Sequence, residues 1–434
     1  KGSGARESPH LARAPSRSST PASQARSGSP PPATPAASPD TGAALPLSRE
    51  DWGGAGVSGS FCRAGTIPFA DIAGAMAAVL GGRCFPLAWL CRCEILSAVR
   101  PSLWVSSKGS PRLGRVTLTF PCCRKAGQGC GRHYRAALCT QLKQPLAIEE
   151  VAPRPVRPHE VRVGVHFCGV NFADILVCRG QYQEKPHLPF IPGMEFSGTV
   201  LETGTDVSTV KEGDRVIGVS GFNGMAEECI MDHKMLWQIP DRVSLREAAT
   251  LPVSYCTAIL ALEHRACTQP GETVLVTAAA GATGLAVIDV ATNVLQAKVI
   301  AAAGSDEKCQ LAMQRGAQAA LNYGQGGLKA AVRKLVGSGG VNVVIDTVGG
   351  DIFLEALRSL AWEGRIVVVG FAGGTIASLP ANLLLLKNVS AMGLYWGRYQ
   401  RENFPVFSRS LSSALQYCQQ GHIQPYIGAV FKLE

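Results

Sequence analysis

The chain has 434 residues, 46% of them hydrophobic, so it is long enough for two or three domains with sizeable cores. Its formal charge of +10 is concentrated near one end, because residues 1–135 hold 17 Lys and Arg but only 6 Asp and Glu. The rest is close to neutral, which gives no support for nucleic-acid binding by most of the chain.

No segment contains the roughly 18 uninterrupted apolar residues that a membrane-spanning helix requires. The nearest candidate, Ile67–Leu90, is broken by Asp71, Arg83 and Pro86. The 15 cysteines have no regular spacing, and the chain does not start with a secretory signal. These features favour reduced thiols in an intracellular protein, cytoplasmic or mitochondrial.

We expect residues 1–133 to be a disordered or poorly structured extension. Residues 1–60 are rich in Ser, Pro, Ala, Arg and Gly and bury too little apolar surface to offset the entropy of ordering. A transit peptide has the same composition, so targeting is an open alternative. The pairs Cys91-x-Cys93 and Cys122-Cys123, with Cys130 and His133, suggest a zinc site, but this spacing suits a tetrahedral centre poorly.

The first folded region, residues 134–256, contains several short segments that alternate between apolar and polar residues. This alternation predicts strands, and their number, with few helices between them, predicts a partly open β-barrel. The predicted strands are Arg135–Glu150, Glu160–Cys168, Gly193–Glu202 and Asp214–Val219.

A glycine turn lies between a buried strand, Thr273–Thr277, and an apolar helical segment, Leu285–Gln296. The turn reads A-x-x-G-x-x-G, and the unpaired N–H groups at the start of such a helix bind a dinucleotide pyrophosphate. Because an alanine replaces the usual first glycine, an ordinary tight turn is the alternative. The predicted phosphate-binding residues are Ala278, Gly281, Ala282, Thr283 and Gly284.

Strands and helices alternate through the second region, residues 257–390, which predicts a doubly wound parallel sheet of the Rossmann type. The predicted strands are Lys298–Ala303, Ala319–Tyr323, Val341–Asp346 and Arg365–Gly370, and the predicted helices are Asp306–Arg315, Leu328–Val336 and Ile352–Leu360. The loop that starts Gly370-Phe371 follows a buried strand at the expected nicotinamide edge, although a plain glycine loop would look the same.

The end of the second strand favours NADPH over NADH. It reads Ala303-Gly304-Ser305, which is small and neutral where NAD-binding sites carry an acidic residue for the ribose. Lys308 follows one helical turn later and is suited to pair with a 2′-phosphate, or it lies on a solvated helix face. Asp306 argues the other way, since it can bind a ribose hydroxyl, but it suits a helix N-terminus equally well.

Four motifs in the right order resemble the medium-chain dehydrogenase/reductase superfamily: CGVNFADILVCRGQY (168–182), LPFIPGMEFSGTVLETG (188–204), KEGDRVIG (211–218) and LPVSYCTAILAL (251–262). Within it the chain is similar to the zinc-free quinone oxidoreductases of the zeta-crystallin type, over about residues 134–434. The resemblance implies a GroES-like catalytic domain followed by a Rossmann-type cofactor domain.

Zinc-dependent members of that superfamily carry Cys and His where this chain has Asn171 and Met194. Asn and Met are poor Zn²⁺ ligands, so we expect no metal site. Without a Lewis acid to stabilise an alkoxide, alcohol oxidation is disfavoured, whereas an electrophilic quinone or enone needs no metal.

The resemblance also implies site residues. Asn171 and Tyr182 match positions facing the nicotinamide and the substrate, although a turn-capping Asn and a core-edge Tyr are the structural alternatives. The relatives carry a second tyrosine where this chain has Leu176, which implies a more apolar pocket. The implied cofactor contacts are Tyr255 and Thr257 near the carboxamide and Ser305, Lys308 and Tyr323 around the 2′-phosphate.

The expected activity is hydride transfer from NADPH to a quinone or α,β-unsaturated carbonyl, with the proton from Tyr182 or water. The alternatives are a non-catalytic NADPH-binding protein that also binds RNA, and an enoyl-thioester reductase. A homodimer joined along the strand Ala391–Trp396 is implied by the resemblance.

Residues 391–434 should complete the cofactor sheet and return to the catalytic domain through a helix, Phe404–Gln420, and a strand, Ile427–Leu433. Relatives continue with a further helix and strand, so the resemblance predicts that the chain is incomplete at Glu434.

Overall fold

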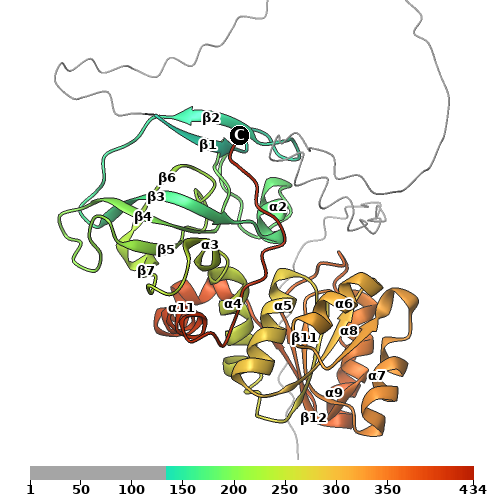
Figure 1. The fold of residues 1–434 in the computed structure, drawn as a ribbon. Helices are drawn as coiled ribbons and strands as arrows, with labels where there is room; N and C mark the ends of the chain where they lie inside the picture. Colours follow the sequence, from blue (N-terminus) through green and yellow to red (C-terminus); the bar gives the residue numbers. More distant parts are fainter. Residues whose placement is uncertain (1–132) are drawn as a thin grey trace, which may run out of the picture. The chain divides into compact units, whose positions relative to one another are not determined.

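The computed structural model describes residues 133–434, which form a mixed α/β structure with two large sheets (Figure 1). The predicted extension, the targeting alternative and the cysteines of the disfavoured zinc site, Cys91 to Cys130, lie outside the described residues. No helix in this part of the chain is long and apolar enough to cross a membrane.

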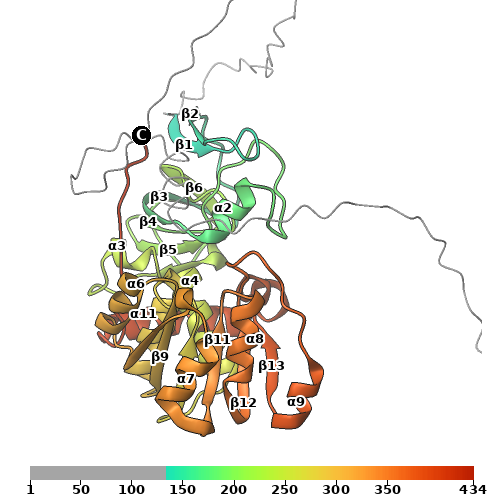
Figure 2. The same ribbon diagram turned by 90° about the vertical axis from the view of Figure 1, so that its right-hand side faces the viewer.

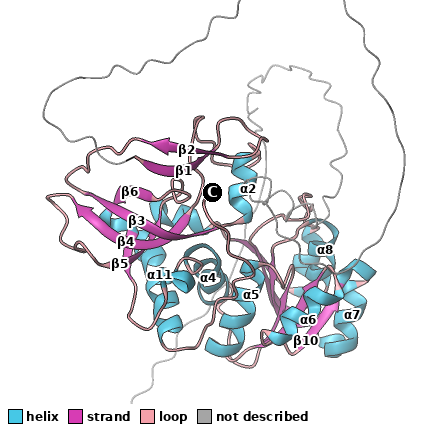
Figure 3. Cartoon of the chain, turned by 45° about the horizontal axis from the view of Figure 1, so that its top comes forward, coloured by secondary structure: helices cyan, strands magenta, loops and turns pink. Residues whose placement is uncertain are grey.

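The first region is built on a five-stranded antiparallel sheet in the order β6-β3-β4-β5-β7 (Figure 1). Figure 3 shows β6, β3, β4 and β5 of this sheet from another side. Its strands are β3 (Glu160–Gly169), β4 (Glu195–Thr203), β5 (Arg215–Val219), β6 (Glu228–Asp232) and β7 (Leu236–Gln238). The predicted strand Arg135–Glu150 is instead a hairpin of β1 (Tyr134–Leu138) and β2 (Ala147–Val151). The chain reverses between them, where Lys143 takes a left-handed backbone conformation at φ 65°.

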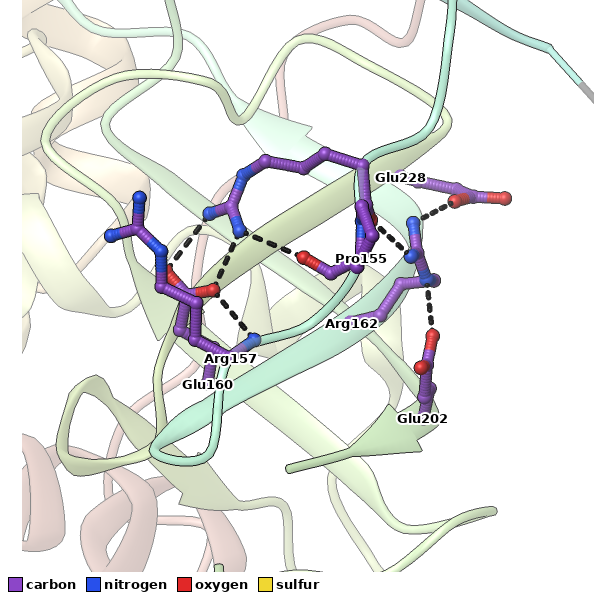
Figure 4. Close-up of polar contacts among 7 residues, drawn as sticks. Pro155, Arg157, Glu160, Arg162, Glu202 and Glu228 are labelled. Carbon is purple, nitrogen blue, oxygen red and sulfur yellow. Dashed lines mark hydrogen bonds and ion pairs between the residues drawn. The ribbon is translucent and has the colours of Figure 1, made fainter. Parts of the chain in front are cut away.

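Charged side chains connect β3 to its neighbours (Figure 4). Arg162 on β3 binds Glu202 of β4 over 2.9 Å and Glu228 of β6 over 3.1 Å. Arg154 donates to both carboxylate oxygens of Glu160, at 2.6 and 2.9 Å. These hydrogen bonds lower the pKa of Glu160 to about 2, so the carboxylate at the start of β3 is ionised at neutral pH.

Helix α2 (Phe172–Cys178) lies between β3 and β4, and two further helices, α3 (Leu245–Ala248) and α4 (Pro252–Ile259), connect this region to the next. Ser244 caps α3 and accepts from the backbone N–H of Glu247, whose carboxylate accepts from the Ser244 N–H in return. Helix α4 continues as a π-helical turn, Leu260–Arg265, and therefore runs through the predicted domain boundary at 256/257.

The second region contains a six-stranded parallel sheet in the order β10-β9-β8-β11-β12-β13, the doubly wound arrangement that the sequence predicts. Its strands are β8 (Thr273–Val276), β9 (Lys298–Ala303), β10 (Ala319–Asn322), β11 (Val341–Asp346), β12 (Leu360–Val368) and β13 (Ser390–Gly393). Its helices are α5 (Ala282–Asp289), α6 (Asp306–Gln314), α7 (Leu328–Val336), α8 (Gly350–Arg358) and α9 (Ala381–Lys387).

Helices cover both faces of this sheet (Figures 1 and 2). Successive strand side chains point to opposite faces, so Val274 and Val276 of β8 pack with α4 and α5, while Leu275 packs with α7 and α8. Both faces are buried, which explains why the strands read as continuous apolar runs rather than alternating ones.

The chain ends with α10 (Tyr399–Glu402), α11 (Phe404–Gln419) and an irregular segment. The prediction of a strand at Ile427–Leu433 is wrong, because the segment pairs with no strand of the described residues. Apolar residues alternate there, yet Val430 and Phe431 are 54% and 57% exposed, and Leu433 packs against the cluster that contains Ala137. Apolar alternation alone does not form a strand when no partner supplies the backbone hydrogen bonds.

Candidate active site

Asn171 lies between β3 and α2 and is held by a buried carboxylate. Its side-chain Nδ2 donates to Oε1 of Glu195 over 2.7 Å, and the backbone N–H of Val253 donates to the other oxygen over 2.7 Å. Asn171 and Glu195 are 8% and 2% exposed. Glu195 therefore joins the loop that carries Asn171 to the first turn of α4.

A second buried carboxylate, Asp174, fixes the backbone around Asn171. Its oxygens accept from the N–H of Asn171 at 2.9 Å and from the N–H of Gly193 at 3.0 Å. Gly193 has φ 101°, and a Cβ there would lie 2.6 Å from the backbone nitrogen of Met225, so only glycine fits. Burial raises the pKa of Asp174 to about 6 and that of Glu195 to about 7.

Met194 lies between Gly193 and Glu195 in the sequence and packs against the cluster that contains Phe190. Neither Asn171 nor Met194 offers a thiolate, imidazole or carboxylate. Within residues 133–434, no three His, Cys, Asp or Glu side chains are placed to hold a metal ion.

Tyr182 lies in the loop after α2, half-buried against the cluster that contains Val177 and Phe190. Burial raises the pKa of Tyr182 well above its ordinary value, and the neighbouring Tyr395, Glu184 and Asp174 add to the effect. The phenol is therefore protonated at neutral pH and can donate a hydrogen bond to a substrate oxygen.

The glycine turn has the form that a phosphate site requires. Gly281 is the N-cap of α5, and no side chain caps this helix. Ala278 takes φ 46°, a left-handed conformation at the position of the missing first glycine. A Cβ on Gly284 would lie 2.4 Å from the Ala278 carbonyl oxygen and 2.8 Å from the Ala279 Cα. The predicted Ala282 and Thr283 form the first turn, whose N–H groups have no helical acceptor, so the turn fits a pyrophosphate.

The residues predicted for the 2′-phosphate gather beyond β9. Ser305 is the N-cap of α6 and accepts from the Lys308 N–H over 3.4 Å. The Tyr323 ring lies 3.5 Å from the place a Cβ on Gly304 would take. Asp306, the residue that argued for NADH, accepts from Asn322 Nδ2 over 2.8 Å. The Asp306 carboxylate is therefore already hydrogen-bonded to Asn322, which weakens the argument for a ribose hydroxyl of NADH as its partner.

Gly370 and Phe371 follow β12 and lie against the loop after β11. The N–H of Ala372 donates to the Thr347 carbonyl over 2.8 Å, and Phe371 is 45% exposed, with its ring against Gly349. The loop is therefore anchored at its base while an aromatic side chain remains on the surface.

Tyr255 and Thr257 on α4 are both buried, at 4% and 8% exposure. The Tyr255 hydroxyl donates over 2.7 Å to Asp289 of α5, a carboxylate that also accepts from Asn293 and from the Gln424 N–H. Tyr255 therefore packs α4 onto α5, and its contact with the cofactor stays a prediction. Thr257 lies one helical turn after Val253, the contact of Glu195, and stays in the proposed cofactor site.

Sequence reasoning did not assign roles to Glu195, Asp174, Tyr395 and Glu184. The first two lie inside the motifs quoted for the resemblance, where an acidic residue between apolar neighbours was the available signal. Tyr395 and Glu184 bond to each other, but they lie 211 residues apart, and no sequence pattern links them.

Comparison with known proteins places both regions among dehydrogenases. Residues 157–241 match the family model described as alcohol dehydrogenase GroES-like domain, and residues 282–413 match zinc-binding dehydrogenase. Quinone oxidoreductase-like protein 2 of Bos taurus is 84% identical over 312 residues, which are 72% of this chain and 89% of the relative. Quinone oxidoreductase of Homo sapiens is 30% identical over 64% of this chain and 83% of its own length.

Solved structures agree with these matches. The Escherichia coli quinone oxidoreductase complexed with NADPH superposes with a TM-score of 0.62 at 25% identity, over 68% of this chain and 90% of that one. A quinone oxidoreductase of Pseudomonas syringae gives a TM-score of 0.62 at 27% identity, over 67% and 90%.

Proposed function

This chain belongs to the quinone oxidoreductase branch of the medium-chain dehydrogenase/reductase superfamily, and from that membership we propose that it reduces a quinone or an α,β-unsaturated carbonyl with NADPH and without a catalytic metal. The observation that carries the proposal is the uncapped glycine turn of α5 together with the fixed Asn171. The first suits a dinucleotide, and the second offers amide hydrogen bonds to a carbonyl-bearing acceptor.

Different residues of the cofactor region would bind different parts of NADPH. The N–H groups after Gly281 would hold the pyrophosphate, and the Lys308 ammonium, with Ser305 and Tyr323, would hold the 2′-phosphate. Thr257 and the loop at Phe371 would contact the nicotinamide end. When bound, NADPH supplies a hydride to an electrophilic carbon or quinone oxygen.

The catalytic region would bind and protonate the acceptor. Glu195 and Asp174 hold Asn171 in one orientation, so its amide is preorganised for a substrate oxygen. Tyr182 keeps its proton at neutral pH and would donate it to the oxygen that gains negative charge. Because Asn171 and Met194 replace zinc ligands, an acceptor that is already electrophilic suits the site better than an alcohol.

The proposal is tested by following NADPH absorbance at 340 nm with a panel of ortho-quinones, para-quinones and alkenals, with a simple secondary alcohol plus NADP⁺ as the control. We expect turnover with at least one quinone or enone and none with the alcohol. Added chelator should leave the rate unchanged. Absence of turnover with every acceptor, or loss of turnover with chelator, contradicts the proposal.

A further inference from the structure

A fully buried carboxylate, Asp346, ends β11 beside the glycine turn. Asp346 and Thr277 are both 0% exposed, and Thr277 directly precedes the first residue of that turn. The Thr277 hydroxyl donates to Oδ1 of Asp346 over 2.7 Å, and the N–H of Gly349 donates to Oδ2 over 2.9 Å. The N–H of Thr347 in turn donates to the Thr277 hydroxyl oxygen over 3.0 Å. Asp346 therefore joins the end of β8 to the loop that leads into α8.

The loop that Asp346 organises also holds the loop after β12, which contains Phe371. The N–H of Gly373 donates to the Val348 carbonyl oxygen over 3.0 Å. Gly349 has φ 79°, and a Cβ there would lie 2.9 Å from the Phe371 ring, so the two loops are in close contact. Because β11 lies between β8 and β12 in the sheet, Asp346 connects the turn assigned to the pyrophosphate with the loop assigned to the nicotinamide end.

We propose that Asp346 is a positioning residue for the cofactor, which sets the spacing between the pyrophosphate turn and the nicotinamide loop through its bonds to Thr277 and Gly349. The inference rests on the proposed function, in which one dinucleotide spans both loops. Hydride transfer requires the reacting atoms to be placed within about 1 Å, so a change in this spacing weakens both binding and turnover. NADPH and NADH share the pyrophosphate and the nicotinamide, and Asp346 therefore acts on both alike.

The hydrogen bonds explain why this position carries a carboxylate. Thr277 and Gly349 each present a hydrogen to a different oxygen of Asp346. An amide would turn its own NH₂ group toward one of these donors and leave that donor without an acceptor in a fully buried place. Burial raises the pKa of Asp346, but the bonds from Thr277 and Gly349 oppose that rise, and the start of α8 adds the positive end of a helix dipole.

The positioning role is tested with Asp346→Asn and with Thr277→Val, which removes the hydroxyl and keeps the shape of the side chain. We expect the Kd of NADPH and the Kd of NADH, measured by the fluorescence of the bound nicotinamide, to rise by the same factor of roughly 10 in each variant. Thr277→Ser, which retains a hydroxyl, should keep both values within about 2-fold. Because Thr277 and Asp346 act through one bond, the double variant should bind about as weakly as the weaker single variant.

The matched control is Glu272→Gln, which also replaces a buried carboxylate by an amide in the same sheet. Glu272 precedes β8 and accepts from Arg365 of β12 at 2.8 and 2.7 Å, so it connects the same two strands near their opposite ends. This variant should lose thermal stability as the others do but keep the Kd of both cofactors. A general loss of stability is thereby separated from the positioning of the cofactor.

A second readout needs neither cofactor nor turnover. In hydrogen–deuterium exchange of the full chain, the backbone amides of residues 277–284 and 369–375 should exchange faster in Asp346→Asn than in the unaltered protein, and at the original rate in Glu272→Gln. If the unaltered protein binds NADPH and the Asp346 and Thr277 variants keep its Kd and exchange rates, the positioning role is refuted and the proposed function stands. A change in the Kd of NADPH alone also refutes it. If the unaltered protein binds neither cofactor, the proposed function fails and this inference fails with it.

Discussion

The residue type required at position 195 is determined by two N–H donors that face it. Asn171 and Val253 each donate to a different oxygen of Glu195, so the site requires two acceptors at one buried side chain. An ionised carboxylate supplies both, whereas a protonated carboxyl or an amide turns one of its hydrogens toward a donor. The orientation of Asn171 therefore depends on the charge of Glu195.

Because of this dependence, we predict that kcat/KM falls at acidic pH. The pKa of Glu195 is about 7 and that of nearby Asp174 about 6, so kcat/KM should fall as the pH drops through this range and the buried carboxylates take up protons. Glu195→Gln should lower kcat/KM about 10-fold or more at pH 8 and flatten the profile between pH 6 and 8. An unchanged profile in Glu195→Gln, with normal thermal stability, would contradict this role.

Lys308 carries the preference for NADPH in the proposed site. Lys308→Ala removes the only cation that we assign to the 2′-phosphate, so the KM for NADPH should rise about 10-fold while the KM for NADH changes less than 2-fold. Lys298→Ala, at the opposite end of β9, is the control. Equal effects on both cofactors would show that Lys308 does not read the 2′-phosphate. A lower KM for NADH in the unaltered protein would overturn the choice of NADPH itself.

At the scale of single elements, the two glycines of the α5 turn have separable roles. A Cβ on Gly284 meets backbone atoms at 2.4 to 2.9 Å, whereas a Cβ on Gly281 meets only the Ala278 oxygen, at 3.2 Å. Gly284→Ala should therefore cost roughly 1–3 kcal/mol of unfolding free energy, measured by urea denaturation. Gly281→Ala should stay close to the original stability but weaken NADPH binding, because its methyl group occupies the approach of the phosphates. Equal stabilities of the two variants would contradict this assignment.

The ion pair at the start of β3 predicts a pH-dependent stability. The pKa of Glu160 is about 2 in the folded protein against an ordinary 4.5, so its stabilisation is fully present above about pH 4.5 and is lost as the pH falls toward 2. Glu160→Gln should cost about 1 kcal/mol at pH 7, a modest value because Arg154 is 47% exposed. Urea unfolding at pH 7 and pH 3 should show the difference shrinking at low pH. Glu202→Gln should cost less, because the Glu202 side chain is 48% exposed against 9% for Glu160.

At the scale of the whole molecule, β13 is an edge strand that pairs only with β12 among the described strands. The preceding helix, α9, exposes Leu385 and Leu386 at 77% and 66%. An unpaired edge beside exposed leucines is suited to a second copy of the chain. We therefore predict a homodimer by light scattering, and partial dissociation when both leucines are changed to Glu. A monomer at micromolar concentration would contradict the prediction.

The elements that the sequence predicted best are those whose bounds follow from their own local apolar pattern, without reference to a neighbouring segment. Strands Lys298–Ala303 and Val341–Asp346 and helix Leu328–Val336 have the predicted bounds. Each has an unbroken buried run or one apolar helical face between turn residues. The bounds around β12 differ, since the strand begins at Leu360 with a register shift against β11 rather than at Arg365. Such a register shift depends on the neighbouring strand and is not visible in the apolar pattern of the sequence.

The sequence by itself determined the parallel sheet and the glycine turn after β8, because local patterns specify these features, whereas the absence of zinc ligands at Asn171 and Met194 stays a prediction from the resemblance. Only the tertiary structure decided that Arg135–Glu150 is a hairpin, that Ile427–Leu433 forms no strand and that Tyr255 binds Asp289. It also joined Glu195 to Asn171 and Tyr395 to Glu184. Such contacts form between distant segments, and which distant groups meet is set by how the elements pack.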